Sequence, residues 1–305
     1  MRRGPERKAK RTPEKGICCE GRQEKRDGWT GAALRIGVLG PEGSYSEKAA
    51  LTWPKRPPEA TLVYLRDFEE VLKEVEKGDL EAGVVPLENS LEGAVTVTMD
   101  LLLHLSVVIV GEVNLPIRHC LVGRGEGVVR VILSHPQALA QCRQYLKENY
   151  PKAEIRTTGS TSHAARLAQE FPEMAAIAGP EAAARYGLRV LAREIQDERD
   201  NVTRFIVAGK RIPEPTGRDK TSLIIYLERD RPGALFSILQ EFAMRLINLT
   251  RIESRPSRRE LGDYYFYIDL EGHVCDRNVS EALDAVKEKA AMVKVLGSYP
   301  RASAP

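Results

Sequence analysis

The feature that most constrains the fold of this chain is a repeated alternation of short apolar runs with segments whose apolar residues recur at helical intervals. The apolar runs, each followed by such a segment, lie at 35–40, 62–65 and 82–85, and again at 128–133, 153–157 and 175–178. This alternation is typical of parallel α/β sheets. Residues 111–122, between the two series, are expected to form an extended crossing. We therefore expect two parallel-sheet α/β lobes with a ligand cleft between them.

Changes in composition and pattern divide the chain further. The N-terminal segment is rich in Arg, Lys, Gly and Glu and has hardly any apolar periodicity, so we expect it to be disordered. A stretch with two prolines and one glycine indicates a linker, and a β-α-β-β-α-β pattern beyond it predicts a ferredoxin-like domain. The expected parts are a basic tail at 1–33, a two-lobed region at 34–210 (first lobe about 34–111 and 193–210, second lobe about 112–192), a linker at 211–220 and the ferredoxin-like domain at 221–300.

The net charge of +3 is concentrated in the tail. Residues 1–33 carry ten Lys or Arg and five Asp or Glu, a net of +5, which leaves a net of −2 for the remainder. The folded part therefore offers no basic surface of the kind that nucleic-acid-binding proteins need. With 42% hydrophobic and 29% charged residues, the composition is that of an ordinary globular protein.

The sequence favours a cytoplasmic protein without a membrane partner. The longest apolar stretch, 101–110, contains His104 and Ser106 and is too short to span a bilayer. The tail lacks the apolar core of a secretory signal, and its five acidic residues argue against a transit peptide. The five cysteines are odd in number and include no C-x-x-C pair, which favours free thiols in a reducing compartment.

Templates for metal, nucleotide and triad chemistry are not met. The five histidines are scattered, with no H-E-x-x-H pattern and no Cys/His ligand spacing, so we expect neither a metal nor a cofactor. There is no Walker A motif, and the turn at 40–44 is not a G-x-G-x-x-G. Ser162 and His163 are neighbours at a helix start and do not face each other, so His163 is expected to be structural.

Polar turns at strand-to-helix junctions carry the functional signal instead. Hydroxyl and amide side chains stand at four such junctions, 43–46, 88–90, 134–137 and 159–162. Free N–H groups and the helix dipole favour anions at these positions. Each turn alone is more often an ordinary helix cap. Several of them around one cleft indicate a small ligand that bears carboxylates.

The turns also contain sequence motifs in a fixed order. They are Gly40-Pro41-Glu42-Gly43-Ser44-Tyr45-Ser46, Pro86-Leu87-Glu88-Asn89-Ser90-Leu91-Glu92-Gly93, Ser134-His135-Pro136-Gln137-Ala138-Leu139-Ala140-Gln141-Cys142 and Asn201-Val202-Thr203-Arg204-Phe205. The series resembles the G-P-x-G-[ST]-[FY]-S, P-[IL]-E-N-S-x-x-G, S-H-P-Q-x-x-x-Q-C and N-x-T-R-F motifs of the prephenate dehydratase family. In the last domain, Gly233-Ala234-Leu235 and Glu253-Ser254-Arg255-Pro256 resemble the two phenylalanine-binding motifs of the family's ACT domain.

The resemblance implies a fold, an activity and a mode of regulation. It implies a two-lobed catalytic region like the type II periplasmic-binding-protein architecture, followed by an ACT domain. The implied enzyme is a lyase that converts prephenate to phenylpyruvate, water and carbon dioxide in phenylalanine biosynthesis. L-phenylalanine would bind the ACT domain and inhibit it, and the ACT domain would join a homodimer or homotetramer. Fused members carry a chorismate mutase ahead of this region, but 33 polar residues are too few to form one, so the chain resembles the monofunctional form.

The resemblance also implies which residues form the sites. Thr203 would help a hydroxide leave; because a Thr hydroxyl is too weak an acid to ionise near neutrality, we expect it to donate a hydrogen bond or act as a concerted acid. The expected catalytic residues are Thr203, Asn89, Ser134 and Gln141. The expected substrate-binding residues are Ser44, Ser46, Glu88, Ser90, Gln137, Ser160, Thr161, Arg204 and Phe205. The expected phenylalanine-binding residues are Gly233, Ala234, Leu235, Asn248, Glu253, Ser254, Arg255 and Pro256.

Two alternatives stay open at the level of sequence. Arogenate dehydratase resembles the same motifs throughout, so the preferred substrate is not decided. A non-catalytic binding or regulatory protein is the second alternative, because two-lobed α/β folds also serve as solute receptors. The lack of a signal peptide and of a helix-turn-helix argues against a periplasmic receptor and a transcription factor.

Overall fold

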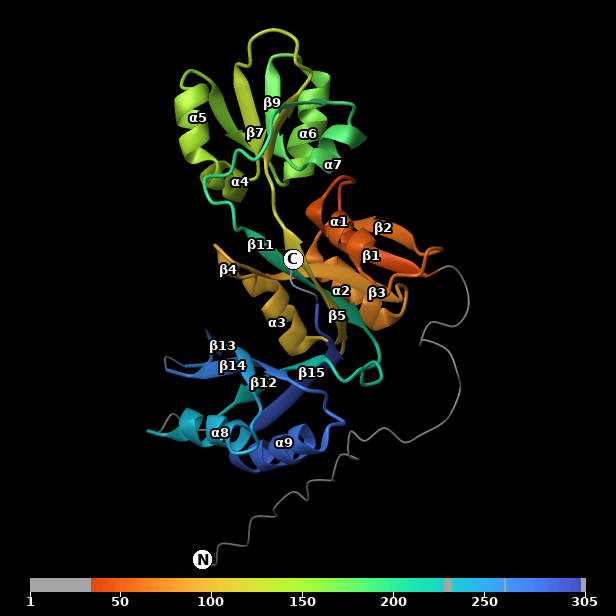
Figure 1. The fold of residues 1–305 in the computed structure, drawn as a ribbon, viewed down its shortest axis with the longest axis vertical. Coiled ribbons are helices and arrows are strands. Elements are labelled where there is room, and N and C mark those ends of the chain that lie inside the picture. The colour runs from red at the N-terminus through yellow and green to blue at the C-terminus, as the bar shows by residue number, and fades with distance from the viewer. Residues whose placement is uncertain (1–33, 228–231, 261, 303–305) are drawn as a thin grey trace, which may run out of the picture.

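Three β-sheets organise the molecule, each with its own helices (Figure 1). The computed structural model describes residues 34–227, 232–260 and 262–302. The tail at 1–33, which the sequence predicts to be disordered, lies outside the described residues. In Figure 1 the first sheet occupies the middle of the molecule, the second sheet the upper end and the ferredoxin-like domain the lower end.

The first sheet is mixed, with strand order β2-β1-β3-β11-β5. Its parallel part comprises β1 (Arg35–Leu39), β2 (Thr61–Leu65) and β3 (Ala82–Asn89), while β11 (Val202–Gly209) runs antiparallel to both β3 and β5 (Val108–Pro116). The expected crossing at 111–122 is therefore shorter, because β5 continues in this sheet as far as Pro116. The short β4 (Gly93–Ala94) and the helices α1 (Tyr45–Thr52), α2 (Phe68–Lys77) and α3 (Thr96–His104) complete this unit.

The second sheet has the order β10-β6-β9-β7-β8 and is also mixed. Its elements are β6 (Cys120–Gly123), β7 (Val131–Ser134), α4 (Pro136–Gln141), α5 (Arg143–Asn149), β8 (Glu154–Thr157), α6 (Thr161–Glu170), β9 (Met174–Ala178), α7 (Pro180–Arg185) and β10 (Arg189–Ala192). The segment of helical spacing that follows 128–133 forms two helices, α4 and α5, which are separated at Cys142, whose φ of −118° and ψ of 18° lie outside helical values. This break leaves Gln141 at the end of α4.

The third sheet confirms the predicted ferredoxin-like domain. Its elements are β12 (Asp219–Tyr226), α8 (Ala234–Ala243), β13 (Leu249–Pro256), β14 (Tyr264–Glu271), α9 (Arg277–Lys289) and β15 (Met292–Pro300), and the strand order is β13-β14-β12-β15. The two helices cover one face. The other face shares an apolar core with the first sheet, in which Ile224 and Tyr267 pack with Leu102 and Ile206. A Cβ added at Gly297 would meet Ile109 O at 2.2 Å, so the two sheets approach closely at β15.

Candidate active site

The centre of the candidate site is a pair of side chains on neighbouring strands. Thr203 lies opposite Asn89 in the pairing of β11 with β3. The Asn89 amide Nδ2 donates to Thr203 Oγ1 at 2.9 Å and to Asn201 Oδ1 at 2.6 Å. All three side chains are buried, with Thr203 9% exposed. Since Thr203 Oγ1 accepts the bond from Asn89, its own hydroxyl hydrogen is available to donate elsewhere.

Backbone groups fix the orientation of the Asn89 carboxamide. The N–H groups of Leu91 and Glu92 both donate to Asn89 Oδ1 at 3.0 Å. A backbone N–H can only donate, so the atom that faces it must be the oxygen, and the nitrogen must face Thr203. The turn that follows β3 therefore decides which atom of Asn89 reaches the hydroxyl.

Hydrogen bonds between amide side chains extend from Asn201 to Gln141 in the second lobe. Asn201 Nδ2 donates to Gln141 Oε1 at 2.9 Å, and the imidazole Nε2 of His119 contacts the same oxygen at 2.9 Å. Two donors on Oε1 leave the Gln141 Nε2 hydrogens for other partners, and Nε2 lies 3.5 Å from Glu92 Oε1. Gln141 ends α4, whereas Asn201 precedes β11, so this chain of bonds joins the two lobes.

Tyr45 and His119 extend the chain without adding charge. The Tyr45 hydroxyl donates to the Arg118 carbonyl at 2.8 Å and lies 3.3 Å from His119 Nδ1. Burial lowers the pKa of His119 below 6.5, although its bond to Gln141 acts in the opposite direction. Burial likewise raises the pKa of Tyr45 well above 10.0. Both rings are therefore neutral near pH 7.

Several predicted substrate-binding residues act as caps or ties. Ser44 Oγ accepts from Glu47 N and donates to Leu39 O, and Ser160 Oγ accepts from His163 N, so each caps a helix. Ser90 Oγ accepts from Val202 N at 3.0 Å, which ties the turn after β3 to β11. The remaining predicted residues of this group are Ser46, buried in α1, Gln137, half-buried one turn before Gln141, and Thr161, half-buried at the start of α6.

Ser134, which the resemblance implies to be catalytic, already uses its hydroxyl hydrogen inside the second lobe. Ser134 is fully buried at the end of β7, and its hydroxyl donates to Ile177 O at 2.6 Å. The donor is thus used to tie β7 to the neighbouring β9. A serine that caps a helix and a serine that bonds to a neighbouring strand look the same in sequence.

Glu88, Arg204 and Phe205 do not lie with Thr203 as predicted. Phe205 is 3% exposed and packs in the apolar core of the first lobe. Arg204 forms ion pairs with Glu112 and Asp269, and Glu88 pairs with Arg251, so both side chains face the third domain. For Arg204 and Glu88 the physical reason is that successive strand residues point to opposite faces of a sheet, whereas Phe205, two residues after Thr203, is held away from the site by its packing in the apolar core.

Sequence reasoning missed Asn201, His119, Tyr45 and Glu92 as members of the site. Asn201 and Tyr45 lie inside two of the motifs, so the motifs themselves contained the signal. His119 has no such signal, because it stands alone in the crossing between β5 and β6 and meets Gln141 only in the folded chain.

The predicted phenylalanine-binding residues fall on two elements of the third domain. Gly233, with a φ of 81°, is the cap of α8, which begins with Ala234 and Leu235. On β13, Ser254 and Pro256 are exposed, and Asn248 is exposed just before this strand. Glu253 and Arg255 point to the other face of β13. Glu253 pairs with Arg251, and Arg255 makes two bonds of 2.8 Å to Asp100 of α3.

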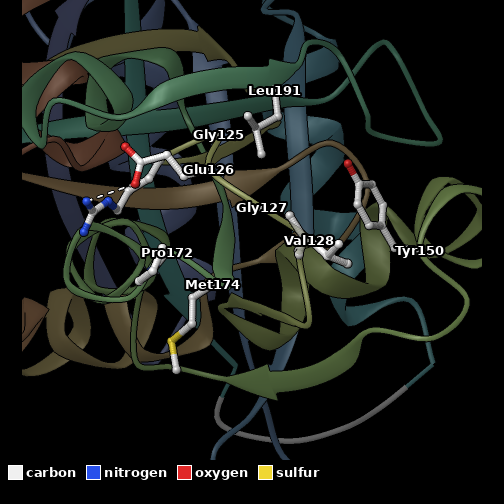
Figure 2. Close-up of a pocket in the computed structure, with 11 residues that line it drawn as sticks. Gly125, Glu126, Gly127, Val128, Tyr150, Pro172, Met174 and Leu191 are labelled. Carbon is white, nitrogen blue, oxygen red and sulfur yellow. Dashed lines mark ion pairs between the residues drawn. The ribbon is translucent and has the colours of Figure 1, made fainter.

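Other parts of the described structure do not add to the site. A cavity of about 380 Å³ lies beside Gly125, Val128 and Tyr150 (Figure 2). It is also lined by Gly123, the last residue of β6, and Met174, the first of β9, and thus lies at the end of the second sheet away from Ser134. Among residues 34–227, 232–260 and 262–302, no three His, Cys, Asp or Glu side chains gather as metal ligands. No helix within these same ranges is both long and apolar enough to cross a membrane.

Fold and site together define a class of protein: a two-lobed α/β protein with a hydrogen-bonded polar site between its lobes and a ferredoxin-like domain packed against the first sheet. The family model for prephenate dehydratase matches residues 36–213, and the ACT domain model matches residues 221–288. The chain belongs to the prephenate dehydratase family.

Relatives and a solved structure agree with this membership. The chain is 42% identical over 275 residues to the bifunctional chorismate mutase/prephenate dehydratase of Aquifex aeolicus, a match that covers 88% of this chain and 74% of that protein. It is 40% identical over 267 residues to the prephenate dehydratase of Methanocaldococcus jannaschii, covering 85% of this chain and 96% of that one. The crystal structure of Arthrobacter aurescens prephenate dehydratase in complex with L-Phe matches with a TM-score of 0.80 and 39% identity, covering 88% of this chain and 90% of that one.

Proposed function

We propose that this protein converts prephenate to phenylpyruvate, water and carbon dioxide. One observation carries the proposal: Thr203 Oγ1 accepts a hydrogen bond from Asn89, so the Thr203 hydroxyl hydrogen is left to donate to another partner. A bond received by a hydroxyl also strengthens the bond that it donates. Thr203 is thus suited to stabilise an oxygen on which negative charge develops.

The reaction needs little else from the protein. The C–C bond to the ring carboxylate breaks, its electron pair enters the ring, and the ring C–O bond breaks as hydroxide leaves and takes a proton. The ring becomes aromatic, so the substrate supplies much of the driving force. Thr203 donates to the departing oxygen, while Gln141 Nε2 and the free N–H groups at the start of α6 are donors for the carboxylates. No step needs a metal or a cofactor.

The test is turnover of the purified protein on prephenate and, in parallel, on arogenate. We expect phenylpyruvate to form from prephenate at a rate that a chelator leaves unchanged. Preference for arogenate would replace the substrate assignment, and a protein that binds prephenate without turning it over would favour a non-catalytic receptor. Activity that is lost with a chelator and restored by a divalent ion would contradict the metal-free mechanism.

Feedback inhibition by L-phenylalanine at the third domain forms part of the proposal. The Arthrobacter relative was crystallised in complex with L-Phe. In this chain, Gly233 opens α8, and no atom of the residues that the structure describes lies within 4 Å of an added Cβ, so among these residues a ligand carboxylate has room to reach the helix start. Calorimetry is expected to detect phenylalanine binding by wild type and its loss in Gly233→Val. Gly217→Val is the matched control, because Gly217 has the same φ of 81° and the same open surroundings in the linker.

A homodimer or homotetramer through the third domain is proposed as well. Large apolar side chains are exposed on and just after α8, with Phe236 67%, Met244 59% and Leu246 93% exposed, and Ile252 of the edge strand β13 is 46% exposed. Large exposed apolar side chains and an unpaired strand edge are each typical of association surfaces. Light scattering of wild type and of Leu246→Glu tests this, and a monomeric wild type would contradict it.

The domain limits and the cellular location are also proposals. We assign the catalytic region to 34–210, with lobes of about 34–111 plus 193–210 and 112–192, the linker to 211–220 and the regulatory domain to 221–300. The continuation of β5 to Pro116 supports moving the first lobe's limit a few residues later. A cytoplasmic location is supported by Cys120 and Cys142, which are buried and form no disulfide.

A further inference from the structure

Two consecutive residues of β11 serve opposite faces of the first sheet. Thr203 pairs with Asn89 across the strands, and the next rung pairs Arg204 with Glu88. On one face of the sheet, the first pair is joined by the hydrogen bond between the Asn89 and Thr203 side chains. On the other face, the side chains of the second pair, Arg204 and Glu88, form ion pairs with residues of the regulatory domain. The same two strand segments therefore hold the reacting hydroxyl and an interdomain contact.

The contact made by Arg204 is buried and uses its whole guanidinium. Arg204 Nε donates to Glu112 at 2.7 Å, one terminal nitrogen to Asp269 at 2.5 Å and the other to the Tyr299 hydroxyl at 2.8 Å. The Arg204 side chain is 11% exposed, that of Asp269 3% and that of Glu112 1%. Asp269 and Tyr299 belong to β14 and β15, and the Ser222 hydroxyl of β12 contacts both of them. All three strands are in the regulatory sheet.

In this cluster Arg204 and Asp269 each keep the other ionised. Burial alone would lower the pKa of Arg204, but Tyr299, Asp269 and Glu112 raise it well above its ordinary value. Burial would raise the pKa of Asp269, but Arg204 and the Ser222 hydroxyl keep it below 3.8. Both groups therefore stay ionised near pH 7. Movement of one side chain without the other would leave a buried charge unpaired, which is costly, so they are held together.

A β-bulge lies next to this contact. In the pairing of β11 with β3, Arg204 faces Glu88 but Phe205 faces Pro86, so Leu87 has no partner. A bulge bends its strand and redirects side chains, and it interrupts the regular ladder that would fix their positions. Beside the bulge, Arg204 makes the charged contact of β11 with the third domain, so a displacement of its side chain acts where the pairing of β11 with β3 is least regular.

We propose that Arg204 is a positioning residue that connects the regulatory sheet to Thr203. Movement of β14 and β15 displaces Asp269 and Tyr299, the guanidinium follows them, and β11 moves so that Thr203 Oγ1 changes its distance to Asn89. Inhibition by phenylalanine follows if the ligand favours the arrangement with the displaced hydroxyl. This inference rests on the proposed function for its kinetic consequence, but not for the mechanical link itself.

The experiment compares two Tyr→Phe variants at the same interface. Tyr299→Phe removes the hydroxyl that contacts Arg204. Tyr267→Phe removes a buried hydroxyl of the same sheet that donates to Met99 O of α3 at 3.0 Å and does not touch Arg204. We expect Tyr299→Phe to raise the half-inhibiting phenylalanine concentration about fivefold or more, the lower end of ordinary coupling, and Tyr267→Phe to change it less than about twofold. Asp269→Asn is expected to act like Tyr299→Phe.

Hydrogen exchange supplies a readout independent of turnover. Phenylalanine is expected to change the exchange of the amides at 202–206 in wild type and in Tyr267→Phe, and to have little effect on them in Tyr299→Phe. Equal behaviour of the two tyrosine variants in inhibition and exchange would overturn the role of Arg204. A wild type whose exchange at 202–206 responds to phenylalanine but which leaves prephenate unchanged would contradict the proposed function and support the link.

Discussion

Removal of the Thr203 hydroxyl is the sharpest test of the site, and the structure sets the size of its two effects. Thr203→Val keeps the shape of the side chain. It deletes the donor to the departing oxygen, for which kcat is expected to fall about 10²–10⁴-fold, or about 3–5 kcal/mol of activation free energy. It also deletes the acceptor of one Asn89 N–H, while the other N–H keeps its bond of 2.6 Å to Asn201. One unpaired buried donor is expected to lower the free energy of unfolding by about 1–3 kcal/mol.

Steady-state kinetics and thermal unfolding separate these two effects. We expect KM to change little, since the hydroxyl acts on an oxygen that becomes charged only in the transition state. The melting temperature is expected to fall by roughly 2–4 °C per kcal/mol lost. Thr203→Ser is the control, because it keeps a hydroxyl at the same place and is expected to retain turnover within about tenfold of wild type. A Thr203→Val enzyme within about threefold of wild type in kcat would refute the assignment.

Three further predictions concern other parts of the molecule. A chain that starts at Leu34 is expected to fold and keep its turnover, since every contact described for the site is made by later residues; loss of activity in a folded chain would contradict this. Asp100→Asn is expected to lose about 1 kcal/mol of stability at neutral pH. The bond to Arg255 keeps the pKa of Asp100 below 3.8, so the difference from wild type is expected to shrink as pH falls below 3.8 in denaturant titrations. Burial keeps the pKa of His119 below 6.5, so wild type is expected to lose stability as pH falls below 6.5, and His119→Gln is expected to lose less over the same range.

Local signals predicted local structure well. Asp67 with Glu70 three residues later is a helix-start pattern, and a following Gly is a helix-stop signal. In the structure Asp67 caps α2 by accepting from Glu70 N, and Gly78 ends that helix with a left-handed φ of 94°. The ferredoxin-like order of the third domain follows from the succession of its apolar patterns. Both depend on residues close together in sequence, or on the order of elements along the chain.

Pairings between distant segments could not be predicted in the same way. The sequence led us to expect residues 193–210 in the first lobe, but the place of β11 between β3 and β5, antiparallel to both, depends on contacts across more than 80 residues. His119 meets Gln141 only because the crossing segment and the end of α4 approach each other in the fold. The position of Arg204 was within reach of the sequence, because strand alternation alone places it on the face opposite Thr203.

The separation of charge across β11 suits a reaction that expels a carboxylate. Around Thr203 and Asn89 the amide and imidazole partners are the neutral Asn201, Gln141 and His119, and the carboxylate of Glu92 lies 3.5 Å from Gln141 Nε2. A cation beside the carboxylate that leaves as carbon dioxide would stabilise the ground state, where the charge is localised, more than the transition state, where it spreads into the ring. Neutral donors would hold the substrate without that penalty. Arg204, adjacent to Thr203 in sequence, lies on the opposite face, where its charge stabilises the interface between domains instead of the substrate.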